Sequence, residues 1–286
     1  MMKSKWYKKG SALIHELKSS AALDSGIFIW FLGQSGFALR LGTSMVLVDT
    51  VLNDLVGDDG KSRRNYEPPF DADELDFIDY YVSTHEHSDH MPLPTILALE
   101  KSCPKIKFIV PAPLTRILIE KGIAENKIIP AREEQKLTLA NEETEIFPIA
   151  AAHTEYVQDE NGDHFYLGYI FKHKDISIYH AGDTIVTEKL VVDLKKNSPI
   201  DIALLPINGQ DWERTRNHII GNLNARDAVM LAENVSFDLT IPCHYDMFMG
   251  NGEDPAIFTA YMYSRCPERK FHIMALGERL PYIKAD

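Results

Sequence analysis

Short apolar runs recur along the chain, rich in β-branched and aromatic residues and bounded by Gly, Pro, Asn or Asp. Such runs between turn-forming residues are typical of β-strands. The pattern predicts strands over residues 27–32, 37–41, 45–51, 78–83, 106–110, 144–150, 165–172, 176–180, 202–207, 239–242 and 271–276. The first three runs are closely spaced, as in an antiparallel meander, whereas helix-length segments separate several later ones. We therefore expect a mixed sheet system covered by helices.

Helix signals lie between several of these runs. Asp254 precedes Pro255, which places an acid at the N-cap and proline at the first helical position. Asn224 is followed three residues later by Asp227, an arrangement that resembles a capping box. His15 lies on a candidate amphipathic helix. Further helices are predicted over residues 93–101, 115–121 and 187–196. Two sheets packed between helix layers would fit this order of elements.

Composition narrows the class of protein. The 286 residues carry 30 Lys and Arg against 42 Asp and Glu, a net charge of −12, and 45% of them are hydrophobic. This balance is that of an ordinary globular protein and excludes a disordered or fibrous chain. We predict a single domain over residues 1–286, in which residues 1–25 form a helical extension. An acidic chain lacks the cationic surface that a phosphate backbone needs, so nucleic acid is not an expected partner.

The cysteines and the apolar runs bear on the cellular compartment. Cys103, Cys243 and Cys266 are odd in number and far apart, which argues against a disulfide framework and for the cytoplasm. The longest apolar run near the start, residues 27–32, is far shorter than a membrane span of about 20 residues. The basic amino terminus is followed by residues too polar for a signal peptide. We expect a soluble, cytoplasmic protein with no membrane partner.

One segment carries an unusual density of metal-ligand side chains. Residues 84–90 read Thr-His-Glu-His-Ser-Asp-His, directly after an apolar run. In an extended chain alternate side chains point the same way, so His85 and His87 share a side, and a turn can aim Asp89 and His90 at a neighbouring point. The spacing suits two adjacent cations.

Six local residues cannot complete two metal sites, so this hypothesis requires further ligands at other strand ends. His153 follows one apolar run and is flanked by small residues. Asp183 lies just past another run, where Gly182 permits a tight bend. His244 follows a third run. These three residues are the predicted additional ligands.

With these motifs the chain resembles the metallo-β-lactamase fold superfamily. The cluster over residues 85–90, the pair Gly182-Asp183 and the late His244 match the superfamily pattern in order. Segments 31–37, 179–183, 201–204 and 241–246 also resemble the L-ascorbate-6-phosphate lactonase family. The similarity covers about residues 27–265. The chain differs from the lactonase pattern in carrying His153 where an acid is expected.

The resemblance implies an α/β (α+β) fold, a four-layer αββα sandwich of two mixed sheets with helices outside and a metal centre at the open edge between the sheets. It implies that His85, His87 and His153 hold one metal, that Asp89, His90 and His244 hold the second, and that Asp183 bridges them. Imidazole and carboxylate ligands suit two divalent ions, Zn or Mn or alternatively Fe, and the cysteine-poor set argues against a closed structural zinc.

Such a centre predicts hydrolysis. Two cations about 3.5–4 Å apart can share a water and lower its pKa from about 15.7 toward about 7, which supplies hydroxide at neutral pH. Asp89 and Asp183 are the expected catalytic residues, with Asp89 orienting the hydroxide. We therefore expect a dinuclear metal-dependent hydrolase. The lactonase-like segments favour a lactonase, in the carboxylic ester hydrolase class, that opens a sugar-phosphate lactone.

A small anionic substrate would need cationic or amide contacts near the metals. The candidates are Arg214, Arg216, Asn217, His218, Arg63 and Arg64. A guanidinium can clamp a phosphate or carboxylate with two hydrogen bonds, although an exposed basic loop explains the same residues. His180 lies three residues before Asp183 and could support that ligand. The family resemblance makes a homo-oligomer the expected assembly.

Two other functions fit the same ligand set. The first is a metal-dependent phosphodiesterase or nuclease, which the net acidity disfavours. The second is a non-catalytic metal- or ligand-binding protein with a regulatory role, which a complete ligand set disfavours. Turnover of bis(nitrophenyl) phosphate faster than any lactone would favour the first, and an inert metal-bound protein the second.

Overall fold

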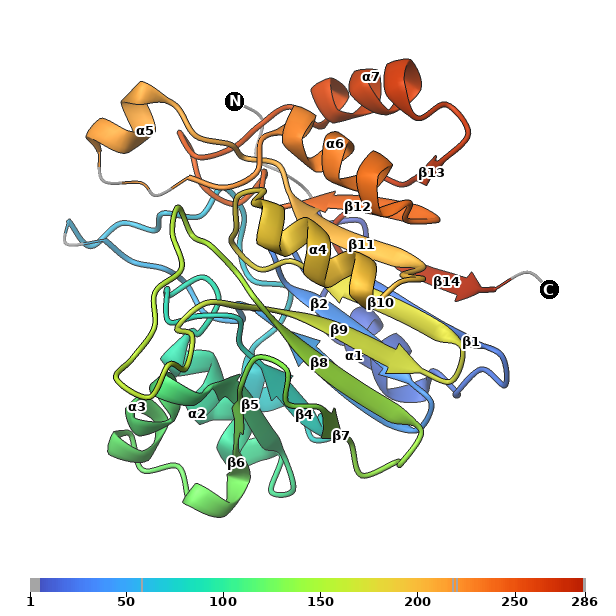
Figure 1. Cartoon of the computed structure of the whole chain (residues 1–286). Helices are drawn as coiled ribbons and strands as arrows, with labels where there is room; N and C mark the ends of the chain where they lie inside the picture. Colours follow the sequence, from blue (N-terminus) through green and yellow to red (C-terminus); the bar gives the residue numbers. More distant parts are fainter. Residues whose placement is uncertain (1–5, 58, 218, 220, 285–286) are drawn as a thin grey trace.

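Two seven-stranded sheets stack face to face, and helices cover the outer surface of each (Figure 1). The computed structural model describes residues 6–57, 59–217, 219 and 221–284. One apolar core lies between the sheets, and two more lie between each sheet and its helices. The predicted four-layer sandwich with mixed sheets is confirmed.

The first sheet has the order β14-β1-β2-β3-β4-β5-β6. Its strands are β1 (Gly26–Phe31), β2 (Phe37–Leu41), β3 (Ser44–Val48), β4 (Tyr80–Val82), β5 (Lys107–Pro111), β6 (Ile128–Ala131) and β14 (Arg279–Ile283). Strands β1 to β3 form the predicted antiparallel meander, and β3 to β6 run parallel. The last strand returns from the far end of the chain and pairs antiparallel with β1, where Gly26 faces Ile283.

The second sheet has the order β13-β12-β11-β10-β9-β8-β7. Its strands are β7 (Leu137–Thr138), β8 (Thr144–Ala150), β9 (Leu167–His173), β10 (Ile176–His180), β11 (Ile202–Pro206), β12 (Leu239–Cys243) and β13 (Lys270–Phe271). Strands β7 to β10 are antiparallel, and β10 to β13 are parallel. Both sheets therefore repeat one plan, in which a meander is followed by parallel strands.

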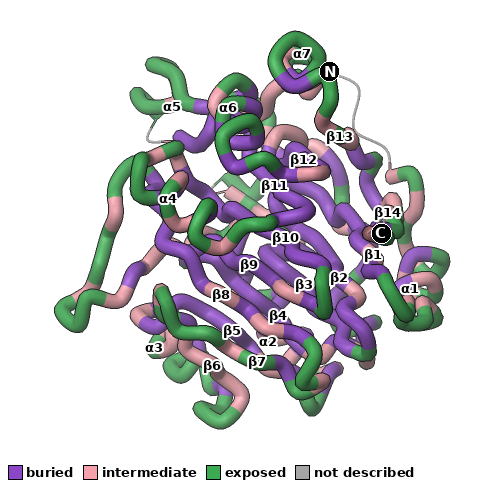
Figure 2. The backbone as a smooth tube through the Cα atoms, turned by 45° about the vertical axis from the view of Figure 1, so that its right-hand side comes forward, coloured by how far each residue is buried: buried purple, intermediate pink, exposed green. Residues whose placement is uncertain are grey.

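Side chains alternate between the two faces of each strand, as strand geometry requires. In β1, Ile27, Ile29 and Phe31 join the core between the sheets, whereas Trp30 belongs to the core beneath the helices. Both faces are covered, which explains why the predicted strands are apolar throughout instead of alternating with polar residues. Figure 2 shows the result as buried backbone along the sheets.

Helices form the two outer layers. The elements are α1 (Gly10–Ser19), α2 (Leu93–Ser102) and α3 (Thr115–Glu120) on the first sheet, α4 (Glu188–Lys196), α6 (Ala225–Val235) and α7 (Pro255–Arg265) on the second, the short α5 (Trp212–Arg216), and the 3₁₀ turns η1 (Ala72–Glu74), η2 (Ala112–Leu114) and η3 (Glu125–Lys127). Both predicted N-caps are confirmed: the Asn224 side chain accepts from the Asp227 backbone N–H at 2.9 Å, and Asp254 accepts from Ala256 at 2.9 Å.

The strands that the pattern does not predict all lie at sheet edges. Strand β7 has two residues, and β6 and β14 contain Pro130 and Pro281, which an edge strand tolerates because the missing N–H costs it no ladder bond. The strand predicted over residues 271–276 is wrong beyond Phe271, because the chain leaves the second sheet there and crosses to the first. The segment interpreted as an exposed basic loop contains α5.

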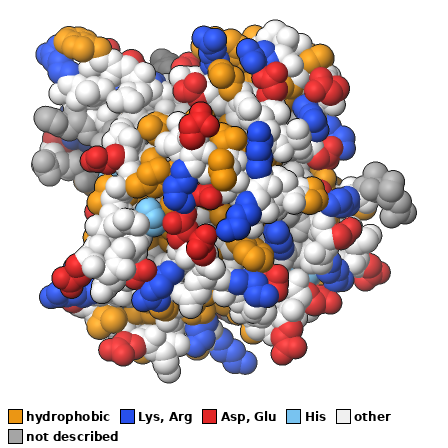
Figure 3. Space-filling model, in the orientation of Figure 1, with side chains coloured by type: hydrophobic (Ala, Val, Ile, Leu, Met, Phe, Trp, Pro, Cys, Tyr) orange, Lys and Arg blue, Asp and Glu red, His pale blue; other side chains and the backbone are white. Residues whose placement is uncertain are grey.

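The surface shows mixed charge. On the face shown in Figure 3, Lys and Arg side chains are interspersed with Asp and Glu, and no broad cationic area forms among the residues drawn in colour. Among the described residues, the helices lack the combination of length and apolar character that crossing a bilayer requires.

Candidate metal centre

Four strand ends meet at one edge of the sandwich. Strand β4 of the first sheet leads into residues 85–90, and in the second sheet β8, β10 and β12 lead to His153, Asp183 and His244. These three strands run in the same direction, because two antiparallel steps separate β8 from β10 and parallel steps join β10 to β12. Their carboxyl ends therefore lie together, and residues far apart in the chain converge there.

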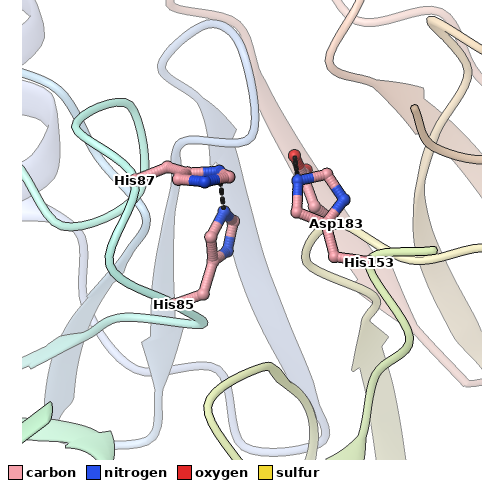
Figure 4. Close-up of side chains that lie close together, drawn as sticks. All are labelled: His85, His87, His153 and Asp183. Carbon is pink, nitrogen blue, oxygen red and sulfur yellow. Dashed lines mark hydrogen bonds and ion pairs between the residues drawn. The ribbon is translucent and has the colours of Figure 1, made fainter. Parts of the chain in front are cut away.

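The first ligand group consists of His85, His87, His153 and Asp183, whose donor atoms all lie within 4.8 Å of one another. His85 Nε2 is 2.9 Å from His87 Nδ1, and His153 Nε2 is 3.6 Å from Asp183 Oδ2. Figure 4 shows the two imidazoles of His85 and His87 on one side facing His153 and Asp183 on the other. Three imidazoles and a carboxylate thus converge on one point.

The second ligand group consists of Asp89, His90 and His244, again with donor atoms within 4.8 Å. His90 Nε2 lies 3.3 Å from His244 Nε2, and His244 Nε2 lies 3.4 Å from Asp89 Oδ2. Asp183 Oδ1 lies 3.3 Å from the Nε2 atoms of both His90 and His244. Asp183 therefore presents one carboxylate oxygen to each group.

The chemistry of these donors fits divalent cations. Asp183 Oδ1 is buried and makes no hydrogen bond, although two imidazole nitrogens lie nearby. A buried carboxylate oxygen that makes no hydrogen bond is costly, and a cation between it and the nitrogens would remove that cost. Nitrogen and oxygen donors without a thiolate suit Zn, Mn or Fe. Cys243, next to His244, lies in the core between the sheets.

Neighbouring groups orient the imidazoles. Thr84 Oγ1 donates its hydrogen to Asp49 Oδ2 at 2.6 Å. Toward His85 Nδ1, which is 3.0 Å away, the Thr84 hydroxyl can therefore only accept, so His85 Nδ1 carries the proton. Asp49 Oδ2 also accepts from His90 Nδ1 at 2.7 Å. His153 Nδ1 donates to the backbone oxygen of Gly221 at 3.2 Å. Each of these rings keeps its Nδ1 proton, which leaves Nε2 free to bind a metal.

Asp49 was not among the predicted site residues. The apolar run over residues 45–51 is interpreted as one strand, but β3 ends at Val48 and Asp49 turns inward with a φ of 46°. The signal in the sequence is an acidic residue inside an apolar run. Such a residue is rarely buried without a partner.

Gln34 is the second unpredicted contributor. Its Nε2 donates to Asp89 Oδ2 at 2.9 Å, and its backbone oxygen accepts from the His244 N–H at 2.7 Å. Its backbone N–H donates to Asp246 Oδ1 at 3.0 Å. The same Asp246 oxygen accepts from the Tyr66 hydroxyl at 3.0 Å. The β1–β2 loop of the first sheet is thereby tied to two members of the second ligand group.

Three residues at this edge have strained backbone conformations. Gln34, Asp49 and His244 have φ values of 57°, 46° and 58°. The left-handed region is disfavoured for residues other than glycine, so the surrounding contacts must hold these conformations. Strain of this kind is typical of functional sites.

Burial and neighbouring charge move the pKa values of the cluster in opposite directions. Burial lowers the pKa of His85 well below its usual value. Burial would also lower the pKa of His244, but the carboxylates of Asp183 and Asp89 outweigh it and raise this pKa to about 9. Burial would raise the pKa of Asp183, yet His244 and His90 hold it well below its usual range. The carboxylates are thus kept ionised, the form that binds cations.

The cavity over the cluster has a volume of about 260 Å³. It is lined by His87, Ser88, Asp89, His153, Asp183, Ile219, His244, Phe248 and Asn251. Among the arginines in the described ranges, none lines this cavity.

The candidate basic residues make other contacts. Arg64 donates to three backbone oxygens of its own loop at 3.0–3.1 Å, and Arg214 donates to the backbone oxygen of Gly252 at 2.7 Å. These bonds give both guanidinium groups a structural role. The Arg216 guanidinium lies 5.2 Å from the centre of the Trp212 ring.

The remaining candidates lie in varied positions. Asn217 ends α5, and His218 lies outside the described residues. Arg63 Nη2 lies 3.0 Å from Asp59 Oδ1. His180 Nε2 donates to the Ser35 backbone oxygen at 2.8 Å, and its Nδ1 accepts from the Gly182 N–H at 3.2 Å. His180 thus holds the backbone of the residue before Asp183, and support of the Asp183 carboxylate stays a prediction.

A family profile described as the β-lactamase superfamily domain matches residues 44–245. The chain belongs to the metallo-β-lactamase superfamily. The matched span contains both ligand groups, and the sandwich described above is the metallo-β-lactamase fold.

Three proteins are similar to this metallo-β-lactamase superfamily member. A UPF0173 metal-dependent hydrolase from Caldivirga maquilingensis is 25% identical over 254 residues, which cover 88% of this chain and 97% of that protein. Another from Pyrococcus furiosus is 27% identical over 255 residues, covering 88% and 98%. Igni18, a metallo hydrolase from Ignicoccus hospitalis, has a TM-score of 0.69 at 19% identity, covering 91% and 100%, and supports the fold.

Proposed function

We propose that the protein is a metal-dependent hydrolase whose centre holds two divalent ions, Zn or Mn or alternatively Fe. The observation that carries this proposal is the position of Asp183, with one carboxylate oxygen facing each ligand group. His85, His87 and His153 would hold one ion, and Asp89, His90 and His244 the other. The similar proteins described as metal-dependent hydrolases support the same activity.

The residues of the chain supply orientation and charge. When bound, two cations supply a water of lowered pKa and a Lewis acid for the bond to be cleaved. Gln34 holds one oxygen of Asp89, which fixes the plane of this carboxylate at the cavity wall. Asp89 can then orient a water at the cavity wall. Asp49 holds His90 in the tautomer that leaves Nε2 available.

The substrate is a small molecule. A cavity of about 260 Å³ next to the ligand groups is too small for a folded polymer, and it supplies imidazole and carboxylate groups but no nucleophilic thiol. Among hydrolytic reactions we propose attack at a carbonyl carbon, with opening of a lactone as the leading case. The lactonase-like segments around Gln34, Asp183 and His244 support this choice.

Metal analysis combined with a substrate panel tests the proposal. The protein loaded with Zn or Mn should carry two ions per chain and hydrolyse at least one member of a panel of simple lactones, ascorbate 6-phosphate and bis(nitrophenyl) phosphate. The Asp183→Asn variant should lose metal and about 100-fold or more in kcat/KM, because a bridging carboxylate becomes a neutral amide. The matched control is Asp76→Asn, since Asp76 is an exposed acid paired with Lys18 on the surface. Wild-type protein without bound metal or metal-dependent hydrolysis would contradict the proposal.

A further inference from the structure

A second, larger cavity opens beside the metal-centre cavity. Its volume is about 470 Å³, against about 260 Å³ over the ligand groups. Ser88 and Phe248 line both cavities, so the two lie side by side with a shared wall. We call the larger one the side cleft; its walls are residues 53–56 and 63, the start of α2, and α3. The side cleft is therefore the space next to a molecule bound at the ligand groups.

The side cleft is apolar. All but five of its lining residues carry apolar side chains, among them Leu55, Met91, Leu93, Ile117 and Phe248. Leu93 and Ile117 also pack against the core beneath the helices of the first sheet, so they are held in place. An apolar cavity of this size with a few polar groups at its rim is typical of small-molecule sites.

The charged residues of the side cleft disfavour an anion. Asp54 and Glu86 contribute two carboxylates to its lining, and Arg63 contributes one guanidinium. Arg63 is already paired with Asp59, at 3.0 Å between Nη2 and Oδ1. The lining therefore has an excess of negative charge, which repels a carboxylate or phosphate on a bound molecule.

We propose that the side cleft receives an uncharged apolar group of the substrate, attached to the bond that is cleaved at the metal centre. The substrate class is then a neutral ester or lactone that bears an alkyl or aryl substituent, in place of a sugar phosphate. This inference rests on the proposed function, because the metal centre places the reacting end. Burial of the substituent gives binding energy in proportion to its apolar area.

Binding of alkyl hydroxamates to the Zn-loaded protein tests this inference. The hydroxamate group binds the metals regardless of which reaction the enzyme catalyses, and the alkyl tail reports whether the side cleft binds an apolar group. From acetohydroxamate to octanohydroxamate, calorimetry should show the Kd falling by about threefold to fourfold per methylene until the cleft is filled. A tail of the same length that ends in a carboxylate should lose most of this gain.

A pair of variants on α3 locates the effect. Ile117→Asp should abolish the dependence on tail length, whereas Ile119→Asp, on the same helix but exposed and outside the cleft, should retain it. If Ile117→Asp does not fold, the tail series on the unmodified protein still decides. Equal Kd values along the series, or tighter binding of the carboxylate tail, would overturn the side-cleft assignment while the proposed function stands. No binding of even acetohydroxamate would overturn the metal centre itself, and this inference with it.

Discussion

The carboxylate of Asp49 fixes two ligand-bearing positions at once. It accepts hydrogen bonds from the Thr84 N–H at 2.8 Å, from the Thr84 hydroxyl at 2.6 Å and from His90 Nδ1 at 2.7 Å. All three donors lie within or next to the histidine cluster. A single unpredicted side chain therefore sets the tautomer of one ligand directly and of His85 through Thr84.

Substitution of Asp49 should weaken metal binding without removing a ligand. In Asp49→Asn one carboxylate oxygen becomes an NH2 group, which then faces either the Thr84 N–H or the two donors His90 Nδ1 and Thr84 Oγ1, so the hold on the His90 ring weakens. We expect metal affinity to fall by about 10–100-fold, measured by competition with a chromophoric chelator. Asp79→Asn is the matched control, because Asp79 accepts from the Met45 N–H at the opposite end of β3. Equal affinities of the two variants would refute this role for Asp49.

Gly182 allows the chain to turn into Asp183. Its φ is 60°, and a Cβ atom there would lie 2.8 Å from Thr84 Cβ. Gly182→Ala should therefore destabilise the fold by about 1–3 kcal/mol and also lower metal affinity, as measured by denaturant unfolding and by metal titration. Gly122→Ala shares the left-handed backbone, with a φ of 90°, but meets no atom within 4 Å. It should lose less stability and keep its metal affinity; a metal affinity of Gly182→Ala equal to wild type would contradict the steric argument.

Glu133, a half-buried acid, joins elements outside the centre. Glu133 follows β6 and contacts Lys189 of α4, and its Oε2 lies 3.3 Å from His164 Nε2. Burial would raise its pKa, but hydrogen bonds from His164 and Lys189 lower this pKa from 4.5 to about 2. Edge strand β6 of the first sheet is thereby connected to helix α4 on the second.

This interaction predicts a pH dependence of stability. Because the pKa of Glu133 is lower in the folded state, its contribution is complete above about pH 5 and is lost as the pH falls toward 2. Glu133→Gln should cost about 1–2 kcal/mol at pH 7, and urea unfolding should show this difference from wild type shrinking at pH 3. The control is Glu134→Gln, whose acid is exposed and pairs with Lys196 at 3.3 Å. A constant difference between pH 7 and pH 3 would argue against the assignment.

Local patterns in the sequence predict most of the strands. These strands are predictable because neighbouring residues such as Trp30 and Phe31 are buried on opposite faces of the sheet, which makes the runs apolar throughout. The edge strands β6, β7 and β14 are not predicted, because their residues are partly exposed and two of these strands contain proline. The sequence shows that Arg64 is charged but not which groups it binds, because its guanidinium donates to three backbone oxygens that only the folded loop brings together. The role of Gln34 is not predictable from the sequence, because an amide side chain indicates no particular chemistry until the fold brings it to Asp89.

At the scale of the whole molecule, the metal centre joins the two sheets. Residues 85–90 follow the first sheet, whereas His153, Asp183 and His244 follow strands of the second. Ions bound between them would act as a cross-link that exists only in the folded state.

Metal removal should therefore lower global stability. A ligand present at 100 times its Kd stabilises the folded state by about 2.7 kcal/mol, so chelation should lower the Tm by several degrees. Thermal unfolding with increasing Zn measures this shift, and Asp183→Asn should show a smaller one. Identical melting curves with and without metal would show that no such cross-link forms.

The pairing of β14 with β1 has a consequence for biosynthesis. Residues 279–283 complete a sheet that begins at Gly26, so the first sheet stays one strand short until these residues have left the ribosome. Until then the nascent chain exposes the open edge of β1, a hydrogen-bonding template for other chains. Synthesis of this protein thus includes an interval in which chaperone protection of that edge has its greatest effect.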